Sequence, residues 1–222
     1  MLEDSSQNEG RCGQCRSGNR MPARVGRLPP RGAVAPCASM TCTRGPSLID
    51  IRPVMTPDWQ AIHSWASLEQ VCRYQPWGPN DEGQTQAFVA DAVAAWSEQP
   101  QERFVYAITV GGAVVGNCEL KLRGNAQAEI SYALHPDHWG HGYATLAARK
   151  LLETGFVVHG AHRIFATCDP RNTGSANVLR RLGMTHEGRL RECVLIRDGY
   201  RDSDVYSLLV HEWSRGKLDS VG

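Results

Sequence analysis

One strand–turn–helix–strand unit in the middle of the 222-residue chain limits its possible folds more than any other feature of the sequence. Residues 128–134 alternate apolar and polar side chains, as a half-buried strand does, and lead through residues 135–137 into a turn with two glycines. A helix is expected from about Gly142 to Val158, followed by a strand over 163–168. This order in an otherwise antiparallel chain predicts a mixed sheet with helices on both faces.

The remaining elements are expected on both sides of this unit. Before it we expect a strand over 48–54, two short helices over 61–74, a further helix over about 81–97, and strands over 104–110 and 113–116. The last two strands are joined by Gly111-Gly112, which predicts a two-residue hairpin turn. After it we expect a helix over 174–182 and two strands joined at 197–200. One α/β domain over 47–213 accounts for all these elements.

The first 46 residues differ in composition from the rest of the chain. They contain no Phe, Tyr or Trp and are rich in Gly, Ser, Pro and Arg, which predicts a disordered tail. Residues 214–222 are expected to form a flexible C-terminus. Four cysteines of the tail have a spacing that also suits a zinc site, although neither histidine nor hydrophobic support accompanies them. They are Cys12, Cys15, Cys37 and Cys42. A natural start at Met40 is a further alternative.

Charge and hydropathy exclude several classes of protein. A formal net charge of +1 argues against a protein that coats nucleic acid or an acidic membrane surface. No apolar run reaches about 18 residues, and the start of the chain lacks the apolar core of a secretory signal, so we expect a cytoplasmic protein. His135, His138 and His141 recur every third residue, but the intervening proline and glycine spoil a common face, and no metal is expected.

The turn over Trp139–Ala144 carries the chemistry that the sequence predicts most directly. At the start of a helix, several backbone N–H groups lack partners and point outward with the positive end of the helix dipole. Gly140 and Gly142 remove side chains that would keep an anion from the main chain, and Ala144 permits close packing. The turn therefore predicts a pyrophosphate site, with an unliganded tight turn as the alternative. G-x-G-x-x-G and G-K-[ST] are both absent, which argues against a dinucleotide fingerprint and a P-loop.

Residues 135–145 resemble the Q/R-x-x-G-x-G/A acetyl-CoA motif of the GNAT acetyltransferase superfamily, with Trp139 where Gln or Arg usually stands. The amino-acid sequence of this stretch is similar to that of the RimJ/RimL branch, whose members acetylate N-terminal amines of ribosomal proteins. Three further stretches match that branch in order, so the resemblance spans roughly residues 48–213. They are Arg73–Gly78, Ala128–Tyr132 and Asn172–Met184.

The resemblance implies a GNAT fold, mostly antiparallel, with one parallel strand pair at the cofactor site and acetyl-CoA as cosubstrate. Backbone near Leu134 and His135 would hold the thioester oxygen, and Asn172 would bind the pantetheine arm unless it only caps a helix. The implied cofactor-binding residues are Leu134, His135, Trp139, Gly140, His141, Gly142, Tyr143, Ala144, Thr145 and Asn172.

Catalytic roles follow from the same resemblance. Ser175 matches a serine that protonates the leaving thiolate in some relatives, and a solvent-facing helix serine is the alternative. Glu129 and Glu119 are candidates for the base, and Glu129 fits the branch pattern better, although either is nearly as well explained by a structural salt bridge. The acceptor cleft is implied to be lined by Arg73, Tyr74 and Trp77, of which the two aromatic residues are equally compatible with a core position.

These observations predict an N-acetyltransferase that moves an acetyl group from acetyl-CoA to a primary amine by direct attack. The sequence does not choose between a protein N-terminus and a small-molecule amine, and an enzyme that modifies an amino-bearing antibiotic is a rival. A catalytically silent acyl-CoA-binding module is a second alternative, and a zinc-dependent interaction arm at the N-terminus is a third. We expect neither nucleic acid nor a membrane as partner, and a monomer or a homodimer.

Overall fold

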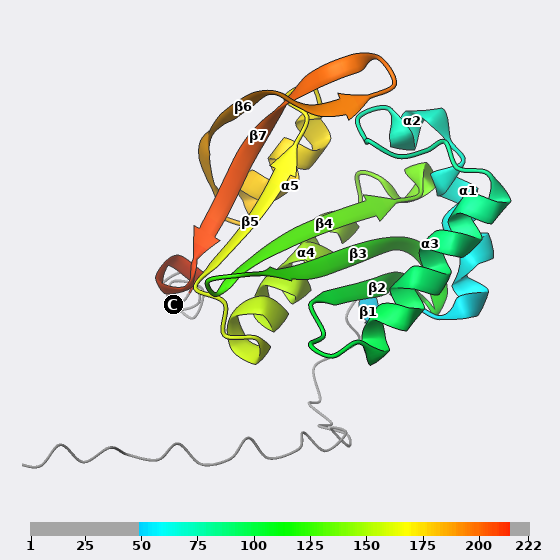
Figure 1. Cartoon of the computed structure of the whole chain (residues 1–222), viewed down its shortest axis with the longest axis horizontal. Helices are drawn as coiled ribbons and strands as arrows, with labels where there is room; N and C mark the ends of the chain where they lie inside the picture. The colour runs from blue at the N-terminus through cyan, green and yellow to red at the C-terminus, as the bar shows by residue number, and fades with distance from the viewer. Residues whose placement is uncertain (1–48, 214–222) are drawn as a thin grey trace, which may run out of the picture. The chain divides into compact units, whose positions relative to one another are not determined.

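The structure is a computed structural model that describes residues 49–213, and its centre is a seven-stranded mixed sheet in the order β1-β2-β3-β4-β5-β7-β6 (Figure 1). The strands are β1 Asp50–Pro53, β2 Arg103–Val110, β3 Ala113–Arg123, β4 Gln127–Leu134, β5 Arg163–Cys168, β6 Thr185–Ile196 and β7 Gly199–Leu209. All neighbouring strands are antiparallel except β4 and β5. The expected mixed, mostly antiparallel fold is confirmed.

Helices cover both faces of this sheet. The helices are α1 Trp59–Ala66, α2 Glu69–Cys72, α3 Glu82–Ala94, α4 Tyr143–Glu153 and α5 Thr173–Arg181. One apolar cluster joins α1 and α3 to β2, and a larger one joins α4 and α5 to the other face of the sheet. Trp65, Leu151 and Leu179 are each no more than 1% exposed, so both layers are closely packed against the strands.

Most of the predicted elements are present, with shifted ends. Gly111 and Gly112 have φ of 56° and 86°, which confirms the two-residue hairpin turn. The strand expected over 113–116 continues to Arg123, because its apolar residues keep alternating toward the sheet core. The helix expected to reach Val158 ends its α-helical part at Glu153, and residues 154–158 form a π-helical turn. The predicted tail and its four cysteines lie outside the described residues.

The parallel pair of strands is short, and this shapes the site. Only three residue pairs join β4 to β5, the last being Glu129 with Phe165. Beyond it β4 stays paired with β3 as far as Leu134, and β5 stays paired with β7 as far as Cys168. The two strands therefore diverge toward their carboxyl ends (Figure 1).

The register of β4 fixes which backbone groups face this divergence. The His135 amide donates to the Val115 carbonyl at 2.9 Å. Because hydrogen-bonding direction alternates along an antiparallel pair, odd-numbered residues of β4 bond to β3 and even-numbered ones point toward β5. The backbone groups of Tyr132 and Leu134 therefore face the space between β4 and β5.

Candidate active site

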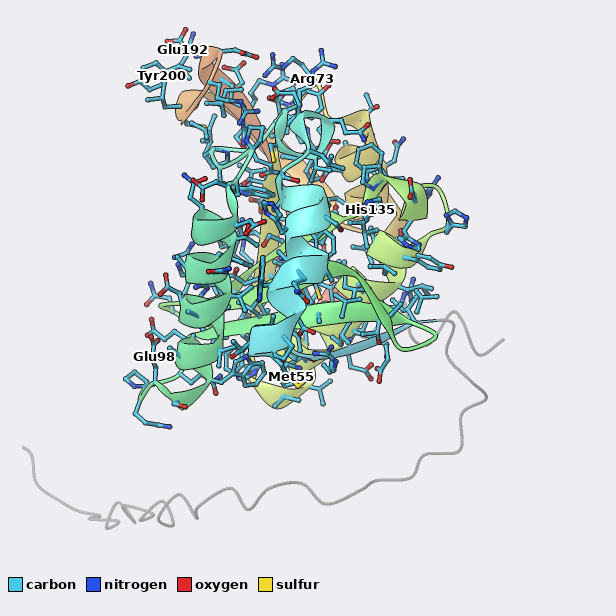
Figure 2. All side chains as sticks on the ribbon, turned by 90° about the vertical axis from the view of Figure 1, so that its right-hand side faces the viewer. Met55, Arg73, Glu98, His135, Glu192 and Tyr200 are labelled. Atoms are coloured by element: carbon cyan, nitrogen blue, oxygen red, sulfur yellow. The ribbon has the colours of Figure 1, made fainter. Side chains whose placement is uncertain are left out.

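The loop between β4 and α4 is built around two glycines with positive φ. Gly140 has φ of 77° and Gly142, the N-cap of α4, has φ of 78°, a region that side chains disfavour. A Cβ atom at either glycine would meet no described atom within 4 Å, so the surface above both is open. Figure 2 shows His135 on the loop that enters this turn.

Consecutive backbone amides of this turn lack acceptors. The first α4 amide with a carbonyl partner is that of Leu146, which donates to the Gly142 carbonyl at 3.1 Å. Within residues 49–213, none of the amides of residues 140–145 donates to a backbone or side-chain acceptor. Outward amides at the positive end of a helix form a site for an anion such as a pyrophosphate.

The side chains of the turn stabilise its shape. Trp139 Nε1 donates to the Leu134 carbonyl at 2.9 Å and ties the loop to the end of β4. The ring of His141 stacks on Tyr143 with centroids 5.4 Å apart. His135 uses its amide in the sheet, so of the two residues expected to hold a thioester oxygen, Leu134 has its amide directed at the divergence and His135 does not.

A cavity of about 340 Å³ lies where β4 and β5 diverge. Its walls come from both strands and from β3, α1, α3, α5, β7 and the segment after α2. It is lined by Ile62, Trp65, Ala66, Tyr74, Gln75, Trp77, Asn80, Phe88, Asn117, Glu119, Ile130, Ser131, Tyr132, Ala133, Ala166, Thr167, Cys168, Asp169, Asn172, Ser175, Leu179 and Arg201. Of the predicted acceptor residues, Tyr74 and Trp77 line this cavity, whereas Arg73 lies outside its lining with its guanidinium 5.5 Å from the Tyr74 ring centroid.

Ser175 faces this cavity from the first turn of α5. Its Oγ is 3.1 Å from the hydroxyl of Tyr132, which lies on β4 across the divergence. The Asn172 side chain accepts from the Ser175 amide at 3.0 Å, so Asn172 caps α5 and also lines the cavity. Burial raises the pKa of the Tyr132 phenol, which keeps it protonated at neutral pH. Tyr132 can therefore donate a hydrogen bond to Ser175.

The two glutamates predicted as candidate bases occupy different places on one face of the sheet. Glu119 lines the cavity, and Arg103 Nε donates to its Oε1 at 3.0 Å. Glu129 lies at the last position where β4 pairs with β5, outside the cavity lining, and Arg123 holds its Oε2. The geometry therefore favours Glu119 over Glu129 as a group that meets a molecule in the cavity.

The sequence of residues 49–185 matches the family model described as an acetyltransferase (GNAT) domain. The chain belongs to the GNAT acetyltransferase family. It is 32% identical over 165 residues to the uncharacterized N-acetyltransferase YnaD of Bacillus subtilis, covering 74% of this chain and 95% of that protein. It is 25% identical over 184 residues to the spermidine N(1)-acetyltransferase of Escherichia coli strain K12, and the match covers 74% of this chain and 88% of that protein.

Solved structures agree with the family. The acetyltransferase (GNAT family) from Bacillus anthracis superposes with a TM-score of 0.66 and 30% identity, over 75% of this chain and 97% of that one. Enzymes of this family use acetyl-CoA as the acetyl donor, so this GNAT domain is an acyl-CoA-dependent acetyltransferase. The six free amides of residues 140–145 suit the pyrophosphate of that donor.

Tyr132 and Arg201 are among the cavity residues of this GNAT domain that were not predicted from the sequence. Tyr132 belongs to a strand whose apolar and polar side chains alternate, and its partner Ser175 comes 43 residues later in the chain. No local sequence pattern therefore predicts their contact. Arg201 follows the turn between β6 and β7, where no motif marks it.

Within residues 49–213 no group of three or more His, Cys, Asp or Glu side chains is arranged to hold a metal ion. None of the described helices is long and apolar enough to cross a membrane.

Proposed function

We propose that this protein transfers an acetyl group from acetyl-CoA to a primary amine by direct attack of the amine on the thioester. The observation that carries the proposal is the run of six acceptor-free amides over residues 140–145, at the end of the strand that borders the 340 Å³ cavity. A pyrophosphate bound there leaves the pantetheine arm free to enter between β4 and β5.

The donor would be held mainly by backbone. The amides of residues 140–145 bind the diphosphate, and the backbone groups of Tyr132 and the Leu134 amide pair with the pantetheine amides as a strand would. The Asn172 side chain lies on the same cleft and offers its amide N–H group, because its oxygen is already used to cap α5. The thioester then lies in the cavity beside Ser175.

The reaction needs one proton acceptor and one proton donor. The amine nitrogen bonds to the thioester carbon, the carbon–sulfur bond breaks, and the electron pair leaves with sulfur. Ser175 Oγ gives its proton to the thiolate while the Tyr132 hydroxyl, 3.1 Å away, orients it, and solvent restores the Ser175 proton as Glu119 releases its own. Glu119 takes the proton that the attacking nitrogen loses, and Arg103 holds the carboxylate in place.

The acceptor is a primary amine on a protein N-terminus or a small molecule. Tyr74 and Trp77 line the cavity from the segment after α2, and Trp65 and Phe88 add further aromatic surface. The similarity of four separate stretches to the RimJ/RimL branch supports an N-terminal amine, whereas the E. coli relative named for spermidine supports a small molecule.

Titration calorimetry and a thiol-release assay together test this function. The purified protein should bind acetyl-CoA with micromolar affinity and release free CoA thiol when a primary amine is added. Binding without release for any amine would identify a silent acyl-CoA-binding module instead. If the folded protein has no affinity for acetyl-CoA or CoA, the proposed function is wrong.

A further inference from the structure

Arg201 on β7 places a guanidinium against the cavity with hydrogen-bond donors unused. Its side chain is 10% exposed and lines the same cavity as Ser175 and Glu119. Its Nη1 donates to the Asp202 carbonyl at 2.8 Å, but its buried Nε has no hydrogen-bond acceptor among the described residues. A buried donor without a partner is costly, so such a group indicates a missing acceptor.

The nearest carboxylate does not supply that acceptor. Asp169 Oδ2 lies 3.6 Å from Arg201 Nε, beyond hydrogen-bond distance. Arg171 already satisfies both oxygens of Asp169, donating to Oδ1 from its amide at 2.8 Å and from Nε at 3.0 Å, and to Oδ2 from Nη2 at 2.7 Å. Asp169 is thus hydrogen-bonded to Arg171 and forms only a longer ion pair with Arg201, which leaves the Arg201 Nε without a hydrogen bond.

The charged side chains of the cavity differ in their hydrogen bonding. The side chains of its lining that are charged at neutral pH are Glu119, Asp169 and Arg201. The two carboxylates are paired with Arg103 and Arg171, which lie outside the lining. Three more carboxylates of the hairpin, those of Glu192, Asp198 and Asp202, line a neighbouring hollow that Arg201 and Asp169 also border. Of the charged side chains in the lining of the acceptor cavity, only Arg201 has no hydrogen bond to a group of opposite charge among the described residues.

We propose that the acceptor is an amine that also carries a carboxylate, and that Arg201 binds this carboxylate through Nε and Nη2. The inference rests on the proposed function, because it names the class of amine that the same cavity takes. The amine end meets the thioester near Ser175 and Glu119. The part of the acceptor between its two ends packs against the aromatic wall of Trp65, Tyr74, Trp77 and Phe88.

The same charges argue against a polyamine. A polycation needs several carboxylates that are free to pair with it along the cavity. Glu119 and Asp169 are each committed to an arginine, and Arg201 would repel a second ammonium group. This domain therefore discriminates against spermidine, although it is similar to an enzyme named for that substrate.

Matched pairs of acceptors test this inference on the wild-type enzyme. The probes are ω-amino carboxylates of increasing chain length, from β-alanine to 6-aminohexanoate, each compared with its own carboxamide. At the best chain length, kcat/KM for the carboxylate should exceed that for the carboxamide by about 10- to 100-fold, the range of a charge-assisted hydrogen bond. Spermidine should be a poorer acceptor than that carboxylate.

Arg201→Gln assigns the effect to the guanidinium. The variant should lose most of the preference for the carboxylate while retaining the turnover of the carboxamide and the affinity for acetyl-CoA. Arg189→Gln is the matched control, because it removes an arginine of the same hairpin that lies outside the cavity lining, and it should keep the preference. If Arg201→Gln does not fold, inhibition of the wild-type enzyme by butyrate but not by butanamide supports the inference.

The outcomes separate this inference from the proposed function. Acetylation of amines without preference for the carboxylate, or with preference for spermidine, overturns the inference and leaves the acetyltransferase in place. A preference that survives in Arg201→Gln overturns the role of Arg201. Absence of transfer to every amine contradicts both.

Discussion

At the scale of single residues, the reacting side chains of the site are held in place by neighbouring side chains. Asn172 caps the helix that carries Ser175, Tyr132 bonds to the Ser175 hydroxyl, and Arg103 holds Glu119. Such supporting contacts restrict the reacting groups to one geometry before any ligand arrives.

Replacing Ser175 by Ala should lower kcat by about 10- to 100-fold, because the leaving thiolate then takes its proton from water. The affinity for acetyl-CoA should stay within about twofold, since the Ser175 amide still donates to the Asn172 side chain that caps α5. Steady-state kinetics and calorimetry measure the two quantities. Unchanged kcat in the variant would remove Ser175 from the reaction.

Exchange of each candidate glutamate for glutamine distinguishes the two carboxylates. Glu119→Gln should lower kcat about 100-fold at neutral pH, and part of the loss should be recovered as the pH rises and more of the amine arrives deprotonated. Glu129→Gln is the matched control and should retain kcat within about threefold, since Glu129 lies outside the cavity lining. The reverse result would transfer the role of base to Glu129.

At the scale of elements, two turns govern binding. The turn before α4 presents the amides that bind an anion, and the turn between β6 and β7 reaches the segment after α2. Figure 2 shows Glu192 and Tyr200 of the β6–β7 hairpin at the same end of the molecule as Arg73. Through Arg197, which donates to the carbonyls of Trp77 and Gly78, the hairpin contacts the segment that supplies part of the aromatic wall of the cavity.

Replacing Gly142 by Val should abolish acetyl-CoA binding, because the side chain opposes φ of 78° and occupies the open surface above the amides. Gly160→Val is the matched control, since Gly160 has φ of 64°, equally open surroundings and a position after the π-helical turn. Both variants should lose about 1–2 kcal/mol of unfolding free energy. Only Gly142→Val should lose acetyl-CoA binding in calorimetry. An equal loss of binding in both variants would contradict the role of the amides of residues 140–145.

Replacing Arg197 by Ala should raise the KM for the amine about 10-fold. Arg197 Nη2 donates to the Cys72 carbonyl at 2.8 Å, and its Nη1 donates to the carbonyls of Trp77 and Gly78. Loss of these three bonds frees the segment that carries Tyr74 and Trp77, while the donor site is untouched. Arg191→Ala, on the same hairpin, is the control. An unchanged KM for the amine in Arg197→Ala would show that the hydrogen bonds of Arg197 do not contribute to amine binding.

At the scale of the whole molecule, two buried carboxylates, Asp58 beside β1 and Asp169 after β5, are paired with arginines. Asp58 is 6% exposed and accepts from Arg52 Nη1 at 2.7 Å and Nη2 at 2.8 Å. Burial alone would raise the pKa of Asp58, but the bonds from Arg52 and from the Met55 amide outweigh it and lower the pKa. The pKa of Asp169 is lowered in the same way against burial, by Arg171 and Arg201.

These lowered pKa values predict that the protein loses stability in acid. The unfolded carboxyl has a pKa near 4, so the stability that the folded carboxylates contribute is complete above about pH 5. It is lost as the pH falls through the unfolded value to the lower folded one. Urea unfolding between about pH 7 and pH 3 measures the loss. Asp58→Asn should be less stable at pH 7 by about 1–3 kcal/mol and less sensitive to acid, and an equal pH dependence would contradict the assignment.

The sequence by itself determined the features that depend on contiguous residues. Gly140 and Gly142 predict a turn that lacks side chains, Gly111-Gly112 predicts a hairpin, and the strand predicted over 163–168 agrees with the structure at both ends. These features depend on backbone conformation and on the period of side chains along one segment, which neighbouring residues set. The family resemblance supplied Ser175 and Asn172, which lie at the cavity.

Only the tertiary structure decided which side chains meet. Glu119 and Glu129 both belong to strands whose apolar and polar side chains alternate, and both lie on the same face of the sheet. Because β4 diverges from β5 only after Glu129, Glu119 lies at the cavity and Glu129 lies outside it. The contact of Tyr132 with Ser175 and the exposure of the Arg201 guanidinium to the same space depend on strand order and register. Packing between segments far apart in the chain sets these positions, and a local sequence pattern does not encode them.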